Sequence, residues 1–339
     1  MRTPVVLRHQ LPFALETYIA ALRVSPVLQR LGQQVLPAKW QRFVASALLR
    51  APSIHVVFEH LTNLHNAAAC CRTADALGVQ SVHLITRQHT HSSLCADILL
   101  GSSDTTTSST PEHEAEPGAL RARAEQAWHT LRQHGPTRRV SKASDALVGS
   151  DSASSGAARW LTIHQHTSTD ACLQQLRQRF GVEHVFASDL SSSSVPIARL
   201  ALPSAYMTPH SDDTGGRHVQ LDVPSLPAIA LVFGNEQSGI SDTVRTHATQ
   251  CFHLPMVGMV ESLNLSVAFG MTLYRLELVG ALRAHLTTPS DAPRSTPPTT
   301  ACLSEHYTHW LNQVLEQWVA QSITHGEQVR LQLRASLES

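Results

Sequence analysis

Three short polar clusters in this chain of 339 residues combine side chains that could do chemistry. Together they offer a guanidinium, carboxylates, amides and a hydroxyl, which are groups that bind a phosphate, hold a hydroxyl or accept a proton. Each cluster also has a purely structural explanation, because asparagine and serine cap helices and glutamate is stable in solvent. In combination they favour a site. The clusters are Asn66 with Arg72, Asn235 with Glu236, and Glu261 with Ser262 and Asn264.

Alternating strand and helix patterns surround these clusters. IHVVFEHL is typical of a buried strand, a polar turn leads into a helix that closes at Gly78, and SVHLI is the next strand. RWLTIH, HVFASDL, AIALVFG and CFHLP continue the strands, and a long helix runs from Leu263 to Leu282. This order predicts one α/β domain with a mostly parallel sheet and helices on both faces. Because loops at the carboxyl ends of parallel strands converge, the three clusters are expected to meet.

Composition divides the rest of the chain. Two stretches rich in Ser, Thr, Gly or Pro bury too little apolar surface to order themselves and are interpreted as surface insertions. Near the C-terminus, Tyr307, Trp310 and Trp318 share one helical face, which is typical of packing. The predicted units are a basic N-terminal extension at 1–37, a domain at 38–283 with insertions at about 101–156 and 191–226, a linker at 284–301, and a C-terminal helical extension at 302–339.

Charge and hydropathy exclude some classes of protein. The formal net charge is zero and hydrophobic residues make up 42% of the chain, so no global basic field indicates a nucleic-acid partner. No apolar run approaches the roughly 18 residues of a membrane span, and we expect no membrane. Before Glu59, however, Glu16 is the only acidic residue among several basic ones. That arm could contact RNA phosphates or target an organelle, which leaves cytoplasmic and mitochondrial locations open.

Several familiar motifs are absent or incomplete. The loop GNEQSG has the glycine spacing of a phosphate-binding loop, but Ile240 stands where the lysine is required, which disfavours a nucleoside triphosphatase. No G-x-G-x-x-G follows the first strand, so a dinucleotide fold is unsupported. The six cysteines form no CxxC pair and fit a reducing compartment. Although there are 21 histidines, none of the strong zinc spacings is present, and we expect no metal.

Three segments carry a resemblance to a known family. NLHNAAACCRTADALGV, LVFGNEQSGIS and LPMVGMVESLNLSVAFGMTLYR resemble, in order, the three motifs of the SpoU-TrmH family of RNA ribose 2'-O-methyltransferases. The match covers roughly 38–281 without the insertions, and the third motif is highly specific. The resemblance implies an α/β fold with a C-terminal deep trefoil knot, the SPOUT fold, which is an exception to unknotted topology. It also implies a homodimer, S-adenosylmethionine as methyl donor, and RNA as acceptor.

The resemblance also assigns residues. Arg72 corresponds to the catalytic arginine, and its role stays open: a guanidinium remains protonated in almost every protein setting, so Arg72 is either a base assisted by an RNA phosphate or a clamp on that phosphate. The other residues follow from their places in the motifs. The implied catalytic group is Arg72, Asn66, Glu236, Ser262 and Asn264, and the implied cofactor-binding group is Leu190, Gly234, Leu254, Met256, Gly258 and Leu263.

The sequence leaves two RNA targets open. The strand RWLTIH, the wording MVESLN and the tail with Trp310 and Trp318 look most like the tRNA-modifying branch, whose members methylate a guanosine ribose in the D-loop. Ribosomal RNA is the nearest rival. A non-catalytic RNA-binding protein with the same knot would be expected to lose Arg72, Asn66 or Asn264, and all three are present. A binding protein for another small ligand is the remaining alternative.

Overall fold

The centre of the molecule is a seven-stranded parallel sheet. The computed structural model describes residues 18–19, 22–86, 157–206, 220–221, 226–286, 302–323 and 326–338. Within them the strand order is β3-β2-β1-β7-β4-β8-β5, and every pairing in this sheet is parallel. The prediction of a mostly parallel α/β sheet is confirmed. The strands are β1 (Ala51–Glu59), β2 (Val79–Ile85), β3 (Thr162–His166), β4 (Val182–Ser188), β5 (Val195–Pro196), β7 (Ala228–Phe233) and β8 (Gln250–His253).

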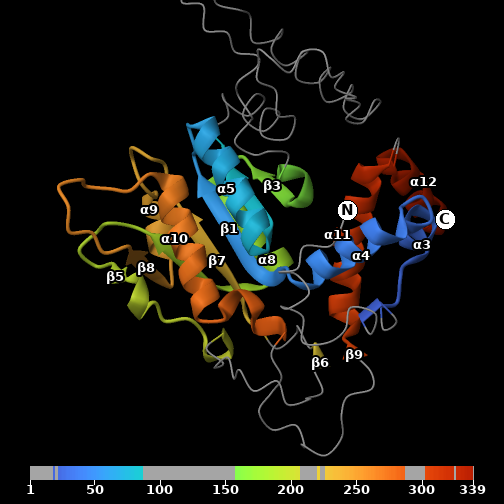
Figure 1. Cartoon of the computed structure of the whole chain (residues 1–339). Helices are drawn as coiled ribbons and strands as arrows, with labels where there is room; N and C mark the ends of the chain where they lie inside the picture. The colour runs from blue at the N-terminus through green and yellow to red at the C-terminus, as the bar shows by residue number, and fades with distance from the viewer. Residues whose placement is uncertain are drawn as a thin grey trace, which may run out of the picture.

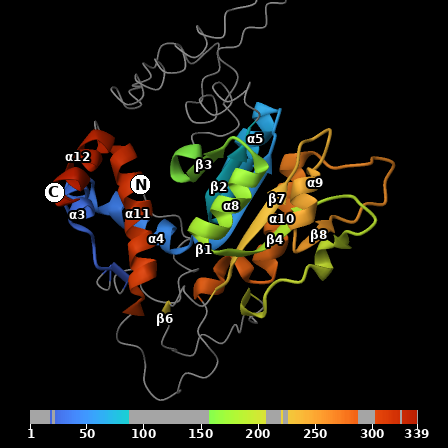
Figure 2. The same cartoon turned by 180° about the vertical axis from the view of Figure 1, so that it is seen from behind.

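Helices cover both faces of the sheet. Helices α5 (Leu64–Leu77) and α10 (Leu265–Leu278) lie side by side on one face, whereas α8 (Thr169–Phe180) lies on the other with α9 (Asp242–His247) (Figures 1 and 2). Strand β1 contributes side chains to the cores on both faces of the sheet, because successive side chains of a strand point in opposite directions. Val56 lies in the core under α5 and α10, and Val57 lies in the core under α8 and α9.

Local signals in the sequence set the ends of these helices. Asn63 is the N-cap of α5, and Gly78, with φ of +84°, closes it as expected. At Gly78 a Cβ would lie 2.8 Å from the carbonyl oxygen of Leu49, so a side chain has no room there. Helix α8 begins after Ser168, whose side chain accepts a hydrogen bond from the Ala171 amide, and ends at Gly181. These boundaries place the loops that follow β1 and β3.

Four further helices form a second hydrophobic cluster beside the sheet. They are α3 (Pro26–Gly32), α4 (Pro37–Leu48), α11 (Glu305–Ser322) and α12 (Gly326–Glu338), so the two ends of the described chain meet (Figure 1). Trp318 of α11 joins this cluster to the sheet domain through its Nε1, which donates a hydrogen bond of 2.9 Å to the Trp160 carbonyl oxygen. The predicted domain boundary near residue 38 therefore falls inside this helical cluster, because α4 packs with α11.

The segment expected to be a second insertion, 191–226, is partly built into the domain. It supplies edge strand β5, and the buried Tyr206 donates hydrogen bonds to Ser53 Oγ at 2.9 Å and to the Pro227 carbonyl oxygen at 2.8 Å. The first insertion, at about 101–156, lies outside the described residues. No helix in the described ranges is long and apolar enough to cross a membrane. The remaining elements are a pair of short strands, β6 (Gln220–Leu221) with β9 (Cys302–Leu303), and 3-10 turns at Ala157–Trp160, Ile197–Arg199, Ser204–Tyr206 and Ala281–Leu286.

Candidate active site

The loops at the carboxyl ends of the strands enclose a cavity of about 780 Å³. It lies where the strand order reverses, since β2 and β3 extend the sheet on one side of β1, and β7, β4 and β8 extend it on the other. Such a reversal is the usual ligand site in open parallel sheets. Segments of the loops after β1, β4, β7 and β8 all contribute to the lining: 62–66, 188–191, 234–239 and 253–265.

Members of all three polar clusters meet in this cavity, as their positions after strands predicted, although Arg72 of the first cluster is not among the lining residues. Asn66 Nδ2 donates a hydrogen bond of 3.0 Å to Glu236 Oε1. Asn264 Nδ2 donates one of 3.1 Å to Asn66 Oδ1. The second carboxylate oxygen, Glu236 Oε2, accepts from Thr62 Oγ1 at 3.2 Å. One network thus joins residues 170 and 198 positions apart in the chain.

The helix-cap explanations apply to only part of this network. Asn63, not Asn66, caps α5, because Asn63 Oδ1 accepts from the backbone amides of His65 and Asn66. Asn264 does cap α10, since its Oδ1 accepts from the Ser266 amide at 2.9 Å. The amide nitrogen of Asn264 is not needed for the cap and serves the network instead. Asn264 therefore has a structural and a site-forming contact at the same time.

The structure separates the other expected residues into two groups. Exposed Ser262 lines the cavity beside Asn264. Arg72 lies on α5 as an exposed side chain and is not among the lining residues of the cavity. Gly258 is also exposed and outside the lining. The remaining residues expected to bind the cofactor all line the cavity: Leu190, Gly234, Leu254, Met256 and Leu263.

A tight turn after β7 forms one wall of the cavity. Asn235 and Gly239 exchange two backbone hydrogen bonds of 2.9 Å. Consequently a Cβ on Gly234 would lie 2.1 Å from the carbonyl carbon of Gly239, and only glycine fits there. Asn235 anchors the turn to the loop after β1, because its Nδ2 donates to the His60 carbonyl oxygen. The wall therefore presents backbone, rather than a large side chain, to the cavity.

An ion pair in the cavity wall was not anticipated from the sequence. Asp189 receives two hydrogen bonds of 3.2 Å from Arg245, from Nε and from Nη2. Burial alone would raise the pKa of the Asp189 carboxyl, but hydrogen bonds from Arg245 and Ser191 outweigh it and hold that pKa below its ordinary value. The one sequence feature that points to this pair is the position of Asp189 directly after a strand. Nothing in the sequence points to its partner Arg245, which is 56 residues away.

Comparison with known proteins shows which family part of this chain resembles. The model of the SpoU rRNA methylase family matches residues 140–274. Over this segment the chain is similar to the SpoU methylases. The protein is an RNA methyltransferase that uses S-adenosylmethionine as methyl donor.

Individual relatives of this chain differ in the length of the match. The tRNA (guanosine(18)-2'-O)-methyltransferase of Escherichia coli K12 is 22% identical over 241 residues, which cover 71% of this chain and 70% of that enzyme. A 23S rRNA (guanosine-2'-O-)-methyltransferase of Haemophilus ducreyi is 47% identical over 49 residues, 14% of this chain and 20% of that enzyme. Among solved structures, the A. aeolicus TrmH/SpoU tRNA modifying enzyme aligns with a TM-score of 0.48 and 19% identity, over 88% of this chain and 98% of that one.

The cavity fits the methyl donor of a SpoU methylase. Its volume lies in the range of small-molecule sites, roughly 300–1,000 Å³, and its wall combines the apolar side chains of Leu190, Leu254 and Met256 with the close backbone turn at Gly234. Apolar side chains suit the adenine and the thioether chain, and backbone amides and carbonyls suit the polar edges of the ligand. The polar network of Asn66, Glu236 and Asn264 borders the same space, where an acceptor hydroxyl would need to reach.

Proposed function

We propose that this RNA methyltransferase transfers a methyl group to the 2'-hydroxyl of a guanosine ribose in the D-loop of tRNA. The length of the match supports tRNA, because 71% of the chain aligns with a tRNA enzyme and 14% with the ribosomal RNA enzymes. Ribosomal RNA is the second candidate, supported by the higher identity within those 49 residues.

The observation that carries the proposal is the hydrogen-bonded network at the edge of the donor-sized cavity. When bound, S-adenosylmethionine supplies a methyl group already activated on a sulfonium. The new bond is between that carbon and the ribose oxygen, the carbon–sulfur bond breaks, and the hydroxyl loses its proton. The protein must therefore align the hydroxyl and help the proton leave, and alignment alone contributes about 7–11 kcal/mol in favourable cases.

Each residue of the network has a defined part in this proposal. Glu236 is fixed through both carboxylate oxygens by Asn66 and Thr62, so it is pre-organised to accept a hydrogen bond from the ribose. Asn264 holds the Asn66 amide in one orientation, and the Ser262 hydroxyl borders the same opening. Arg72 is proposed to contact the phosphate beside the target ribose, because its exposed guanidinium suits an anion on the RNA.

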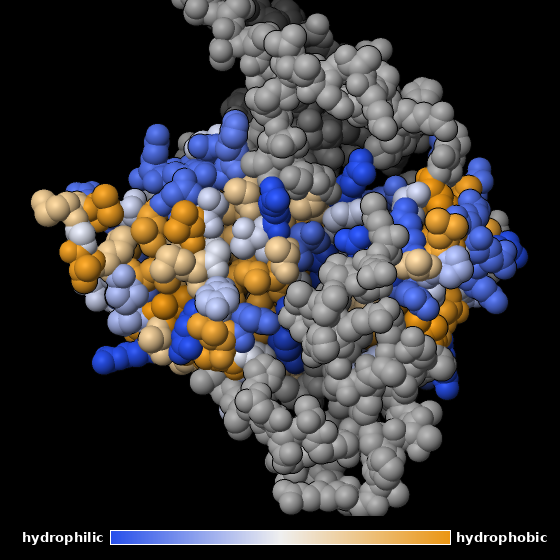
Figure 3. All heavy atoms as spheres, in the orientation of Figure 1, coloured by the Kyte–Doolittle hydropathy of each residue, from blue (hydrophilic) through white to orange (hydrophobic). Residues whose placement is uncertain are grey.

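We also propose that the enzyme acts as a homodimer that pairs through α10. An unusual row of apolar side chains on this helix is exposed, each between 49% and 62%, and Figure 3 shows hydrophobic residues gathered on this side of the molecule. Arg72 is near this face, since the neighbouring Thr73 lies 3.7 Å from the position of a Cβ on Gly270. A dimer formed through α10 would therefore enclose Arg72. The exposed apolar row of α10 consists of Val267, Met271, Tyr274 and Leu278.

The trefoil knot is the remaining part of the proposal. Strand β8 lies beyond β4, whereas the helix that follows it, α10, packs beside α5 at the β1 side of the sheet. The connection 254–264 must therefore cross the end of β7, where the turn 234–239 stands. This crossing supports a threaded chain.

The decisive experiment maps the methylated nucleoside. Purified enzyme is incubated with labelled S-adenosylmethionine and either unmodified tRNA transcripts or fragments of 23S rRNA, and the product is located by nuclease digestion and mass spectrometry. We expect one 2'-O-methylguanosine in the D-loop of tRNA. Methylation confined to the rRNA fragments would replace the tRNA proposal by the second candidate. Binding of S-adenosylmethionine without transfer to either RNA would contradict both.

A further inference from the structure

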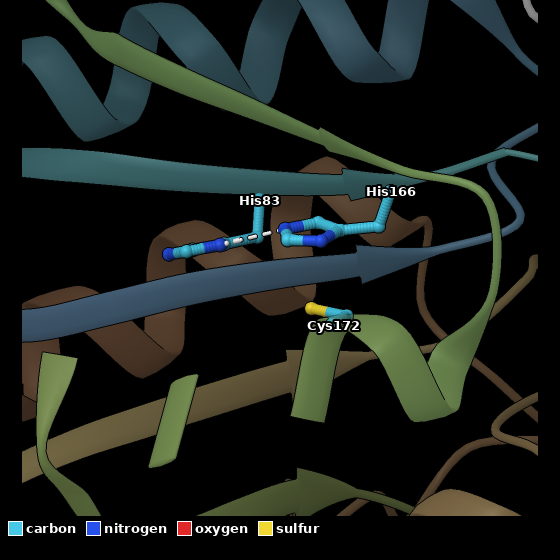
Figure 4. Close-up of side chains that lie close together, drawn as sticks. All are labelled: His83, His166 and Cys172. Atoms are coloured by element: carbon cyan, nitrogen blue, oxygen red, sulfur yellow. Dashed lines mark hydrogen bonds between the residues drawn. The ribbon is translucent and has the colours of Figure 1, made fainter. Parts of the chain in front are cut away.

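A buried cluster of imidazoles lies on the sheet face under α8, opposite the face that α5 and α10 cover. His55 on β1, His83 on β2 and His166 at the end of β3 form a chain: His83 Nε2 lies 3.1 Å from His55 Nδ1, and His83 Nδ1 lies 3.0 Å from His166 Nε2. The ring of His164 stacks on His83 at 4.6 Å. Figure 4 shows the thiol of Cys172 pointing from α8 toward the rings of His83 and His166. Neither the family match nor methyl transfer explains this cluster.

The positions of three of these side chains suit a metal ion. One ring nitrogen of His83, one ring nitrogen of His166 and Cys172 Sγ lie within 4.8 Å of one another, and all three residues are buried. In a tetrahedral zinc site, with zinc–nitrogen distances of about 2.0–2.1 Å and zinc–sulfur of about 2.3 Å, ligand atoms lie roughly 3.3–3.6 Å apart. His83 Nδ1 and His166 Nε2, now 3.0 Å apart, need to separate by a few tenths of an ångström, and Cys172 Sγ needs to approach the nitrogens by at most about 1.3 Å.

The surroundings of the three ligands are also those of a metal site. If His83 Nδ1 binds a metal, its Nε2 carries the proton and donates to His55 Nδ1, which orients the ring as metal-bound histidines are normally oriented. The buried carboxylate of Glu59 accepts a hydrogen bond from Thr169, one turn before Cys172 on α8. One thiolate and a nearby carboxylate balance a divalent cation without leaving a net buried charge.

We propose that His83, His166 and Cys172 bind a divalent transition metal of the zinc class. Two imidazoles and one thiolate are ligands that zinc accepts in preference to magnesium or calcium. Three protein ligands leave the fourth tetrahedral position to a water molecule. The metal fastens α8 to β2 and β3, and β3 is otherwise an edge strand whose only sheet partner among the described strands is β2. Its role is structural, because the site lies on the opposite sheet face from α5 and α10.

The test measures metal directly. Protein is stripped with a chelator, dialysed, and titrated with Co²⁺, and a second sample is loaded with Zn²⁺, desalted, and analysed for zinc by mass spectrometry. We expect one equivalent of zinc, a thiolate-to-cobalt absorption band in the near ultraviolet, and a higher thermal midpoint with Zn²⁺ than without. Cys172→Ser removes the band and the bound zinc. The matched control Cys251→Ser, on β8 and away from the cluster, keeps both.

Two outcomes would overturn the proposal. One is wild-type protein that is folded by circular dichroism yet gives no cobalt–thiolate band. The other is a band that survives Cys172→Ser and disappears in Cys251→Ser. If Cys172→Ser fails to fold, His166→Asn at the strand end serves in its place. Loss of the zinc equivalent in that variant supports the site, and its retention contradicts it. None of these readings depends on methyl transfer, so they stand apart from the proposed function.

Discussion

Asn264 shows how one side chain can serve both the fold and the site. Its oxygen caps α10 through the Ser266 amide, and its amide nitrogen donates to Asn66 in the cavity. From the sequence, a helix cap and a contact in the site are competing explanations for Asn264. The two contacts use different atoms, so they can be separated by substitution.

Asn264→Asp is expected to separate them. The aspartate keeps an oxygen for the Ser266 amide and suits a helix N-terminus, but it cannot donate to Asn66 and places a second carboxylate near Glu236. The thermal midpoint should change little, while methyl transfer should fall at least about 10-fold, or ~1.4 kcal/mol in the barrier. The measurement is the initial rate of methyl transfer at saturating S-adenosylmethionine and RNA. Calorimetric binding of S-adenosylmethionine is the control. A wild-type rate would return Asn264 to a purely capping role.

Arg72→Lys probes the exposed guanidinium of α5. Lysine keeps the charge but lacks the planar fork that binds two oxygens of a phosphate, so most of the turnover should be lost. Stability should be unchanged, because the side chain is exposed. The assay is methylation of the accepted RNA at several salt concentrations. Full activity at all of them would rule out a role for Arg72, whether as base or as clamp.

The individual elements were largely predictable from the sequence, but their partners were not. Apolar runs such as AIALVF identified central strands because a parallel strand is buried on both faces. The face of Tyr307 and Trp318 was correctly interpreted as packing. That it packs against α3 and α4 could not be predicted, since periodicity shows which face is buried and not what covers it. For the same reason the sequence does not predict the Asp189–Arg245 pair, whose members are 56 residues apart.

Trp318 is the side chain on which the helical cluster should depend most. It is almost fully buried, packs edge-on against Trp160 at 6.0 Å, and lies under the guanidinium of Arg50 at 5.0 Å. Trp318→Ala should lower the free energy of unfolding by about 3–5 kcal/mol. Urea unfolding followed by far-ultraviolet circular dichroism measures it. Trp310→Ala, at a partly buried position on the same helix, is the matched control and should cost clearly less; equal losses would contradict this assignment.

Substitutions on the exposed row of α10 test the dimer. Met271→Asp places a charge in the middle of the proposed interface, where burial of an unpaired carboxylate is unfavourable. We expect sedimentation velocity to show a monomer for this variant and a dimer for the wild type. The control is Glu277→Gln on the same helix, whose side chain is only partly exposed and faces Arg283. A monomeric wild type at micromolar concentration would remove the proposal.

At the scale of the whole molecule, a buried histidine links stability to pH. His285 donates a hydrogen bond of 3.0 Å to the Leu48 carbonyl oxygen where the sheet domain meets the helical cluster. Burial lowers its pKa to about 4. The unfolded chain, with an ordinary histidine pKa of about 6.5, therefore binds more protons than the folded one between these values. His285 therefore contributes to the free energy of unfolding above pH ~6.5, and this contribution is lost as the pH falls toward 4.

His285→Asn should reduce this dependence. Asparagine retains an N–H donor but does not titrate, so the slope of unfolding free energy against pH should decrease by up to about 1.4 kcal/mol per pH unit in that window. The Leu48 carbonyl also keeps its second donor, the Tyr307 hydroxyl at 3.2 Å. Urea unfolding at a series of pH values from 4 to 7.5 gives both slopes. Identical slopes for variant and wild type would show that the pKa of His285 is the same in the folded and the unfolded protein, which contradicts this prediction.

The contacts between the ends of the chain also bear on how the protein is made. Ser25 donates to Asn312 through its amide and to Glu316 through its hydroxyl, across 287 and 291 positions. During synthesis at the ribosome, α3 and α4 emerge early but have no partner until α11 has been translated. The apolar faces of α3 and α4 therefore stay exposed to solvent while the sheet forms. In that state the nascent chain can bind chaperones or aggregate. A chain released before α11 is complete would lack that cover permanently and become a substrate for proteolysis.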